Sequence, residues 1–252
     1  MDDKEIKYAV KKRYAKFAKE NTSCCPTCSP QKNDMTKQTE SIGYSLNELK
    51  NIPESAIMGL GCGNPTALAD LKEGETVLDL GSGAGIDVFL AANKVGKNGH
   101  VIGVDMTEEM IKKSEKIAKE NGYTNVEFRF GEIENLPVKD NTADVIISNC
   151  VINLSTDKLK TFREVFRVLK PGGRILISDL VTEGILPDDI KRSFDAWSEC
   201  IAGALEKNEY LNTIKKAGFR KVKIVSQNQY SEKGTDKRIA GKITSIKIRA
   251  YK

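Results

Sequence analysis

Short apolar runs alternate with helix-like patterns through the middle of the chain. The runs are rich in Val, Ile and Leu and cover residues 76–80, 100–105, 125–130, 143–148 and 173–179. Between them, apolar residues recur every three or four positions, which is the spacing of one face of a helix. Strands that alternate with helices pair in parallel through right-handed crossovers. The pattern therefore predicts an α/β fold built on five parallel strands.

The pattern changes after residue 180. A helical segment at about 188–216 is followed by two stretches, 219–230 and 243–252, in which apolar and polar residues alternate across a Gly-containing connection. Alternation with a period of two is typical of antiparallel strands that have one exposed face. We therefore expect a Rossmann-like, mostly parallel seven-stranded sheet with helices on both faces and a final antiparallel hairpin.

The residues before the first strand predict a helix and then a loop. The helix occupies the first 20 residues, and its apolar stripe consists of Ile6, Val10, Tyr14, Phe17 and Ala18. The polar stretch 21–41 contains two prolines and little periodicity, so we expect it to be a loop.

Two later helices carry recognisable ends. Thr107 is placed to cap one helix, and Gly122 suits its left-handed stop. Ser155 is placed to cap the next helix before the PGG sequence ends it. The buried face of that second helix is predicted at Phe162, Val165, Phe166 and Leu169.

Composition and charge exclude several classes of function. The net charge is +5 and aromatic residues make up 6% of the chain, which is a weak signature for nucleic-acid binding. The first 20 residues are too charged for a signal peptide, and no apolar run is long enough to cross a membrane. One histidine, His100, leaves little material for a His-rich metal site or a Ser-His-Asp triad. We expect a cytoplasmic monomer with neither a nucleic-acid nor a membrane partner.

The sequence VLDLGSGAG at 77–85 predicts a ligand loop between a buried strand and a helix. Glycines at this point let the backbone approach a ligand closely. Asp79 ends the first strand, and Asp105 ends the second, where a carboxylate can accept both ribose hydroxyl protons. A dinucleotide site is the alternative, but the third glycine comes one position early, and an acid beside the loop would repel a pyrophosphate.

Together, DLGSGAG, VDMT, GEIENLP and LKPGGR resemble the S-adenosylmethionine-dependent class I methyltransferases over about residues 70–180. The resemblance implies that S-adenosyl-L-methionine is the cofactor and that S-adenosyl-L-homocysteine is the product. The cofactor residues that we expect are Asp79, Gly81, Ser82, Gly83, Asp105, Met106, Gly131, Glu132, Ile133 and Asn149. Among them, Glu132 and Ile133 are expected to bracket the adenine.

Three cysteines lie where a substrate is expected. Cys62 is in a glycine-rich loop before the first strand, Cys150 directly follows the fourth strand, and Cys200 lies on a predicted helix in the insertion after the fifth. Ligands of open α/β sheets bind beyond the carboxyl ends of the strands, so the three thiols are able to converge there. The alternative is that each cysteine packs as a small apolar residue. Glycines around Cys62 and the charge of Glu199 beside Cys200 argue against that alternative.

At GLGCGNP, SNCVINL and WSECIAGAL, the chain resembles the arsenite methyltransferases from about residue 10 almost to its end. The resemblance implies that Cys62, Cys150 and Cys200 bind As(III), supplied as arsenite or its thiol conjugates. It also implies mono- and dimethylated products, thioredoxin or glutathione as reductant, and an N-terminal cysteine in a disulfide relay. The relay candidates are Cys24, Cys25 and Cys28.

Several readings stay open beside this resemblance. Tyr14 is expected near the sulfonium, with packing in the core as the alternative. For CCPTC at 24–28, the alternative to the relay is that it supplies half of the ligands of a zinc site. A methyltransferase for a carbon or oxygen nucleophile, such as a quinone or sterol precursor, would share the cofactor motifs without needing the thiols. A non-catalytic arsenic- or metal-binding protein would use the thiols without the cofactor.

The motifs divide the chain into three segments. Residues 1–58 are expected to form an N-terminal helix and a cysteine-containing lid loop, and 59–180 the cofactor-binding core. Residues 181–252 are expected to form the arsenic-binding insertion and the hairpin that completes the sheet.

Overall fold

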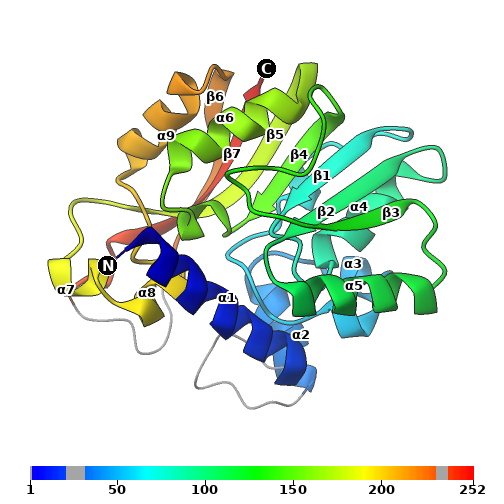
Figure 1. Ribbon diagram of the computed structural model, residues 1–252, viewed down its shortest axis with the longest axis horizontal. Helices are drawn as coiled ribbons and strands as arrows, with labels where there is room; N and C mark the ends of the chain where they lie inside the picture. The colour runs from blue at the N-terminus through cyan, green and yellow to red at the C-terminus, as the bar shows by residue number, and fades with distance from the viewer. Residues whose placement is uncertain (1, 21–31, 231–237) are drawn as a thin grey trace.

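Five neighbouring strands of the sheet are parallel, as the apolar runs predict (Figure 1). The computed structural model describes residues 2–20, 32–230 and 238–252. The parallel strands are β1 (Thr76–Leu80), β2 (His100–Asp105), β3 (Val126–Phe130), β4 (Ala143–Asn149) and β5 (Leu169–Thr182). β5 is longer than predicted because the Lys-Pro-Gly-Gly segment extends it backwards to the end of the preceding helix.

The predicted hairpin is present, and its second strand, not its first, pairs with the parallel strands. It consists of β6 (Arg220–Gln229) and β7 (Ile243–Tyr251). In the part of the chain that the structure describes, one seven-stranded sheet has the order β3-β2-β1-β4-β5-β7-β6. β7 runs antiparallel to both β5 and β6. The chain order reverses between β1 and β4, and this switch point opens a crevice at their carboxyl ends.

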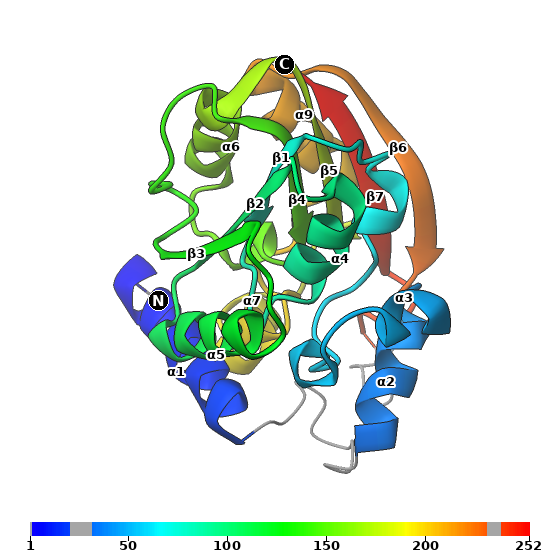
Figure 2. The ribbon, with the colours of Figure 1, turned by 90° about the vertical axis from the view of Figure 1, so that its right-hand side faces the viewer.

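Helices cover both faces of the sheet (Figure 2). Alternate strand residues contribute to two separate cores, one on each face. On one face, α4 (Ile86–Val95) and α5 (Glu108–Glu120) pack over Val77 of β1 and its neighbours. On the other face, α6 (Lys158–Val168) and α9 (Lys207–Lys216) pack over Leu78 of β1. Because successive strand side chains point to opposite faces, one apolar run serves both cores.

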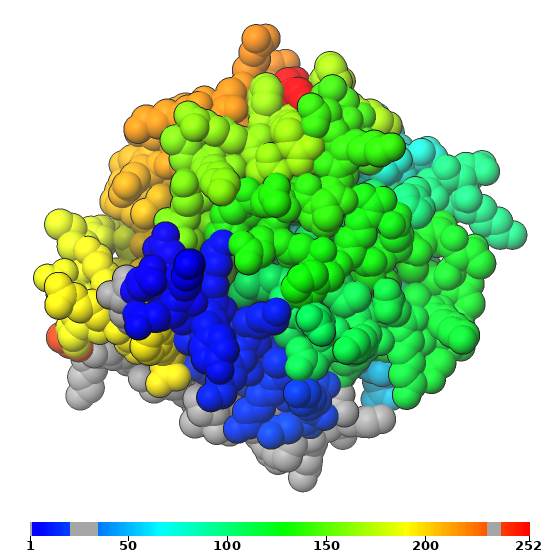
Figure 3. Space-filling model, in the orientation of Figure 1, coloured from blue at the N-terminus to red at the C-terminus, as the bar shows by residue number. Residues whose placement is uncertain are grey.

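The remaining helices lie around the crevice. They are α1 (Asp3–Glu20), α2 (Lys32–Ser41), α3 (Leu46–Lys50), α7 (Asp188–Lys191) and α8 (Phe194–Ser198), with 3-10 turns at Glu54–Ala56, Thr66–Leu68 and Ile152–Leu154. On the surface, α1 lies between α5 and the α7–α8 segment (Figure 3). Ile6, Val10, Phe17 and Ala18 of its predicted stripe are buried, and Tyr14 is half-buried. No helix within the described residues is long and apolar enough to cross a membrane.

The structure corrects three local predictions. Residues 32–41 form α2 rather than a loop, because Pro26 and Pro30 precede this helix and do not interrupt it. The cap of α6 is Asp157, whose carboxylate accepts from Lys160 N at 2.9 Å, and not Ser155. Thr107 does occupy the cap position of α5, but its side chain makes no capping bond, since Thr107 N itself donates to Asp105.

The predicted stop of α5 and most of the predicted buried face of α6 are present in the structure. Gly122 adopts a left-handed φ of 70° just after α5. On α6, Phe162 and Val165 are buried and Phe166 is half-buried, as predicted. Leu169 is buried too, but it belongs to β5.

Candidate active site

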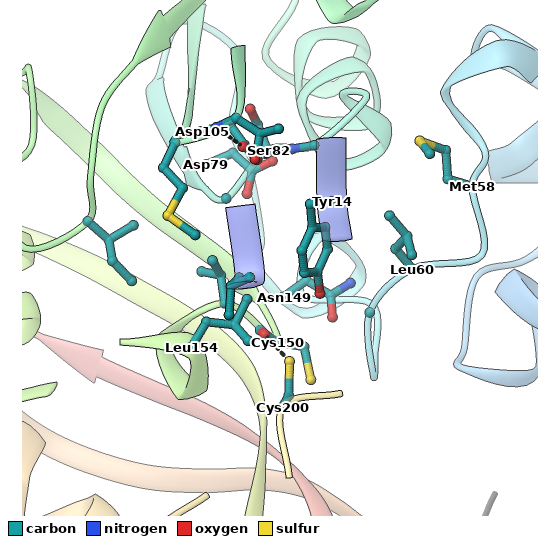
Figure 4. Close-up of a pocket in the computed structure, with 18 of the residues that line it drawn as sticks. Tyr14, Met58, Leu60, Asp79, Ser82, Asp105, Asn149, Cys150, Leu154 and Cys200 are labelled. Atoms are coloured by element: carbon teal, nitrogen blue, oxygen red, sulfur yellow. Dashed lines mark hydrogen bonds between the residues drawn. The ribbon is translucent and has the colours of Figure 1, made fainter. Parts of the chain in front are cut away.

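A cavity opens at the carboxyl ends of the parallel strands, beneath α1 (Figure 4). Asp79, Ser82 and Asp105 lie at one end of it, Cys150 and Cys200 at the other, and Tyr14 lies between them. Met58 and Leu60 form a further wall. The cavity is therefore formed by segments that are distant in the sequence and meet at the switch point of the sheet.

The glycine loop after β1 forms a cradle in which Gly81 and Gly83 carry no side chains. Gly81 N and Ser82 N both donate to Val104 O, at 2.8 and 3.0 Å, which ties the loop to β2. Gly81 has a left-handed φ of 66°, and a Cβ there would collide with Val151. The hydroxyl of Ser82 is buried and has no hydrogen-bond partner among the described residues. Ser82 lines the cavity, and an unpartnered buried hydroxyl is a group that a polar ligand would satisfy.

Two carboxylates flank this cradle. Asp105 accepts from Gly83 N at 2.9 Å and from Thr107 N at 2.8 Å, so it joins the glycine loop to the start of α5. Asp79 is buried, and its pKa lies well above the usual range because of burial and the nearby charges of Asp87 and Asp105. Burial also raises the pKa of Asp105. A ligand with a positive amino group or with hydroxyl donors would relieve both unfavourable environments.

The segment after β3 places different residues in the cavity than its motif suggests. Met106, Gly131 and Ile133 line the cavity as expected. Glu132 does not line it, because its half-exposed side chain accepts a hydrogen bond from Lys7 of α1 at 2.7 Å. The buried Glu134 lines the cavity instead and accepts from the Ser155 hydroxyl at 2.7 Å. Sequence reasoning missed Glu134, which lies in the tight turn between Glu132 and Asn135, where Asn135 N donates to Glu132 O at 3.1 Å and side chains do not alternate as in a strand.

Asn149 holds the loop that carries Cys62. Its Oδ1 accepts from Cys62 N at 2.9 Å, and its Nδ2 donates to Gly63 O at 2.6 Å and to the Tyr44 hydroxyl at 2.9 Å. The Tyr44 hydroxyl in turn donates to the buried carboxylate of Asp87. Asn149 also lines the cavity, so it lies between the expected cofactor region and the thiols.

The structure brings Cys62, Cys150 and Cys200 together in one buried cluster of free thiols. Cys62 is fixed by Asn149 and by Ser245, whose hydroxyl donates to Cys62 O at 2.8 Å. Cys200 follows α8 and is not on a helix, and its Sγ donates to Cys150 O at 2.7 Å. Burial and the neighbouring thiols of Cys200 and Cys62 raise the pKa of Cys150 well above its usual value.

The three cysteines are buried among apolar side chains, contrary to what we expected from the sequence. We expected the glycines around Cys62 and the charge beside Cys200 to disfavour core-like packing. Cys62, Cys150 and Cys200 are 7%, 8% and 5% exposed and pack among apolar side chains. Because Arg13 of α1 pairs with Glu199 at 3.1 Å, that charge does not prevent the burial of Cys200. Cys24, Cys25 and Cys28 lie outside the described residues.

A charged group that the sequence did not reveal lies beneath the thiols. The carboxylate of Asp179 in β5 is fully buried and accepts from the Tyr210 hydroxyl at 2.9 Å. Burial raises its pKa to about 7, and burial likewise lowers the pKa of the nearby Lys158 to about 8. A carboxylate oxygen of Asp179 and the Sγ atoms of Cys62 and Cys150 all lie within 4.8 Å of one another.

α1 closes the cavity from above. Lys7, Val10 and Tyr14 line it. Ion pairs fix the helix to both sides, with Lys7 3.2 Å from Glu134 and Arg13 3.1 Å from Asp195 of α8. The Tyr14 ring therefore faces both the glycine cradle and the thiols (Figure 4).

The sequence of this chain is similar to those of known methyltransferases. A family model described as a methyltransferase domain matches residues 71–218. An arsenite methyltransferase of Halobacterium salinarum is 43% identical over 242 residues, which cover 92% of this chain and 61% of that protein. The human arsenite methyltransferase is 34% identical over 237 residues, which cover 90% of this chain and 61% of that protein. This chain thus spans about three fifths of the length of these relatives.

A solved structure extends the similarity to the fold. The crystal structure of an arsenic(III) S-adenosylmethionine methyltransferase from Chlamydomonas reinhardtii superposes with a TM-score of 0.69 at 32% identity. The superposition covers 85% of this chain and 73% of that one. The similarity therefore extends over most of this chain.

Proposed function

This chain belongs to the arsenite methyltransferase family, a branch of the S-adenosylmethionine-dependent methyltransferases, and from that premise we propose that it methylates trivalent arsenic. Cys62, Cys150 and Cys200 are the proposed arsenic ligands. The observation that carries the proposal is the meeting of three buried thiols with the glycine cradle in one cavity. S-adenosylmethionine supplies an electrophilic methyl group when bound.

The proposed cofactor residues fit that group. The orphaned hydroxyl of Ser82 offers a partner to a polar ligand, and the cradle leaves room for one. Asp105 would accept hydrogen bonds from the ribose hydroxyls, and Asp79 would accept from the positively charged amino group. Met106, Gly131 and Ile133 contribute the walls around the adenine, joined by Glu134 in the place where we had expected Glu132. Gly81 and Gly83 form the cradle itself, Asn149 closes it toward Cys62, and Tyr14 covers it.

The thiols prepare arsenic for attack. When arsenite exchanges its three hydroxyl groups for three thiolates, each cysteine proton leaves with one hydroxyl as water, so charge and atoms balance. Trivalent arsenic bound by three sulfurs keeps a lone pair, so no residue has to remove a proton before methyl transfer. Orientation in the cavity then accelerates methyl transfer. Two reacting groups held at near-attack distance, about 3 to 3.5 Å, have already lost the translational and rotational freedom that makes up much of the activation barrier.

Methylation oxidises arsenic from the trivalent to the pentavalent state, so the cycle needs a reductant. We assign this role to Cys24, Cys25 or Cys28, which form a disulfide with a site cysteine and are reset by thioredoxin or glutathione. We propose that the protein works as a cytoplasmic monomer, where those reductants are abundant.

One assay separates the proposal from its two competitors. Purified protein is mixed with arsenite, glutathione and methyl-labelled cofactor, and the arsenic species are separated. Labelled mono- and dimethylated arsenicals are expected. Arsenite that stays unmethylated but bound to the protein would indicate a non-catalytic binding protein. Neither binding nor labelling of arsenic, with the cofactor still bound, would indicate a methyltransferase for a carbon or oxygen nucleophile.

A further inference from the structure

The tightest group of donor atoms in the thiol cluster includes an oxygen. The Sγ atoms of Cys62 and Cys150 and a carboxylate oxygen of Asp179 all lie within 4.8 Å of one another. All three residues are buried. The proposed arsenic site does not use this carboxylate, because a trivalent arsenic with three sulfur ligands has a lone pair in its fourth direction. Two thiols and a carboxylate are instead the donors that zinc and cadmium take in proteins.

A fourth donor lies next to this group. The Cys200 thiol lies in the same buried cluster, and its Sγ donates to Cys150 O at 2.7 Å. Rotation about the Cα–Cβ bond of Cys200 is enough to move a sulfur atom by a few ångströms. The cluster therefore offers three sulfurs and one oxygen, which is the number of donors that a tetrahedral site needs.

We propose that Cys62, Cys150, Asp179 and Cys200 form a binding site for a thiophilic divalent cation such as Zn²⁺ or Cd²⁺. The proposal rests on the donor geometry and holds whether or not arsenic is methylated. With metal–sulfur bonds of about 2.3 Å, neighbouring sulfurs in a tetrahedral site are about 3.8 Å apart. Donors that already lie within 4.8 Å reach this spacing with a contraction of about 1 Å.

The charges around the cluster favour a cation. Two thiolates and the carboxylate carry one negative charge more than a divalent cation neutralises, and a third thiolate adds another. The ammonium group of the buried Lys158 lies near Asp179 and offsets part of this excess. Each thiol releases its proton to solvent when the cation binds, so binding is accompanied by acidification of a weakly buffered solution.

The site would distinguish cations from arsenic. Both ligands need the thiols and so exclude each other, but only the tetrahedral cation needs the oxygen of Asp179. A divalent metal is therefore an inhibitor that competes with arsenite, and the carboxylate is the residue that decides the balance between the two.

The test uses cadmium alone, without cofactor. Cys24, Cys25 and Cys28 are first replaced by Ser so that the three remaining thiols are Cys62, Cys150 and Cys200. Cd²⁺ is titrated without a competing reductant, and the ultraviolet thiolate-to-cadmium absorption is followed. One Cd²⁺ per chain is expected. Asp179→Asn, which keeps an oxygen acceptor for Tyr210, is expected to weaken Cd²⁺ at least about tenfold and arsenite by less than about threefold.

The matched control is Ser178→Ala. Ser178 Oγ is a hydrogen-bond partner of Cys62 Sγ at 3.8 Å but carries no charge, so its loss should change Cd²⁺ and arsenite binding slightly and equally. Cadmium-113 NMR of the parent protein gives a second readout that needs no Asp179 variant, with a shift for three sulfurs and one oxygen expected. The proposal is overturned if no Cd²⁺ binds, if the shift indicates sulfur ligands alone, or if Asp179→Asn leaves Cd²⁺ unchanged or weakens both ligands equally.

Discussion

The two ends of the cavity are built in different ways. The cofactor end draws on Asp79, Asp105 and the glycine loop between them, a short stretch of sequence on two neighbouring strands. The thiol end draws on Cys62, Cys150 and Cys200, which come from three separate segments. One end is thus local in the sequence, and the other depends on the folding of nearly the whole chain.

The backbone conformations differ in the same way. At the cofactor end the left-handed residues are glycines, such as Gly81 with a φ of 66°. At the thiol end Gly61 beside Cys62 is left-handed as well, with a φ of 107°, but so are Cys150 and Cys200, which carry side chains and have φ values of 60° and 63°. A left-handed conformation costs a residue with a Cβ roughly 1–2 kcal/mol, which the surrounding packing must offset. We conclude that the thiol end is the more sensitive to changes elsewhere in the fold.

The strongest test of this division is loss of a thiol. Cys150→Ser and Cys200→Ser are each expected to lower arsenite methylation by at least about 100-fold, because two remaining sulfurs no longer hold arsenic in orientation. Cofactor affinity should stay within about twofold of the parent when measured by titration calorimetry. If either variant loses its cofactor affinity as well, the two ends are not separate sites.

The reciprocal test removes a cofactor residue. Asp105→Ala loses hydrogen bonds to a charged acceptor, each contributing about 1.5–3 kcal/mol, so cofactor binding should weaken about 10- to 100-fold. Arsenite affinity, measured without cofactor, should hardly change. An equal loss of both ligands would show that Asp105 maintains the fold of the whole cavity through Gly83 and Thr107.

A pH titration sharpens the role of Asp79. Its pKa is raised in the free protein, so the carboxyl group keeps its proton to a higher pH than an exposed one. A cationic amino group binds the ionised form, so the bound state holds fewer protons, and cofactor affinity should rise with pH until the raised pKa is passed. The rise is at most about tenfold per pH unit for one proton. Asp79→Asn should bind more weakly and lose this rise, whereas a rise that persists in the variant would assign it to another group.

The smallest effect is expected from Tyr44→Phe. This change removes the hydroxyl that links Asn149, and thus the Cys62 loop, to Asp87. The free energy of unfolding should fall by about 1–2 kcal/mol, and arsenite affinity should fall more than cofactor affinity. Tyr8→Phe is the matched control, because Tyr8 is 68% exposed. Equal effects at the two positions would mean that the link does not support the thiol end.

The sequence placed most residues of the proposed cofactor end around one cavity, because its signals are local. An apolar strand followed by glycines and an acid identifies its own position, and the structure has those residues around one cavity. The exception is Glu132, which pairs with Lys7 of a helix more than a hundred residues away. No pattern near residue 132 reveals that partner, so Glu134 was missed.

The thiol end could be predicted only in outline. Strand ends showed where Cys150 must lie, but Cys200 was assigned to a helix that ends at Ser198. The contacts that hold the thiols come from residues with no motif of their own, namely Asn149 for Cys62 and Asp179 beneath them. Such contacts depend on tertiary packing, which local patterns do not encode.

The hydrogen bond from Ser245 to Cys62 has a consequence for synthesis. Ser245 belongs to β7, which follows every other described strand in the chain yet lies between β5 and β6 in the sheet. Domains emerge from the ribosome amino end first, so Cys62 is made long before the strand that fastens its loop. Until residues 243–251 have been synthesised, the loop that carries Cys62 lacks its hydrogen bond from Ser245. During that time the Cys62 thiol is accessible to oxidants and to metal ions in the cell.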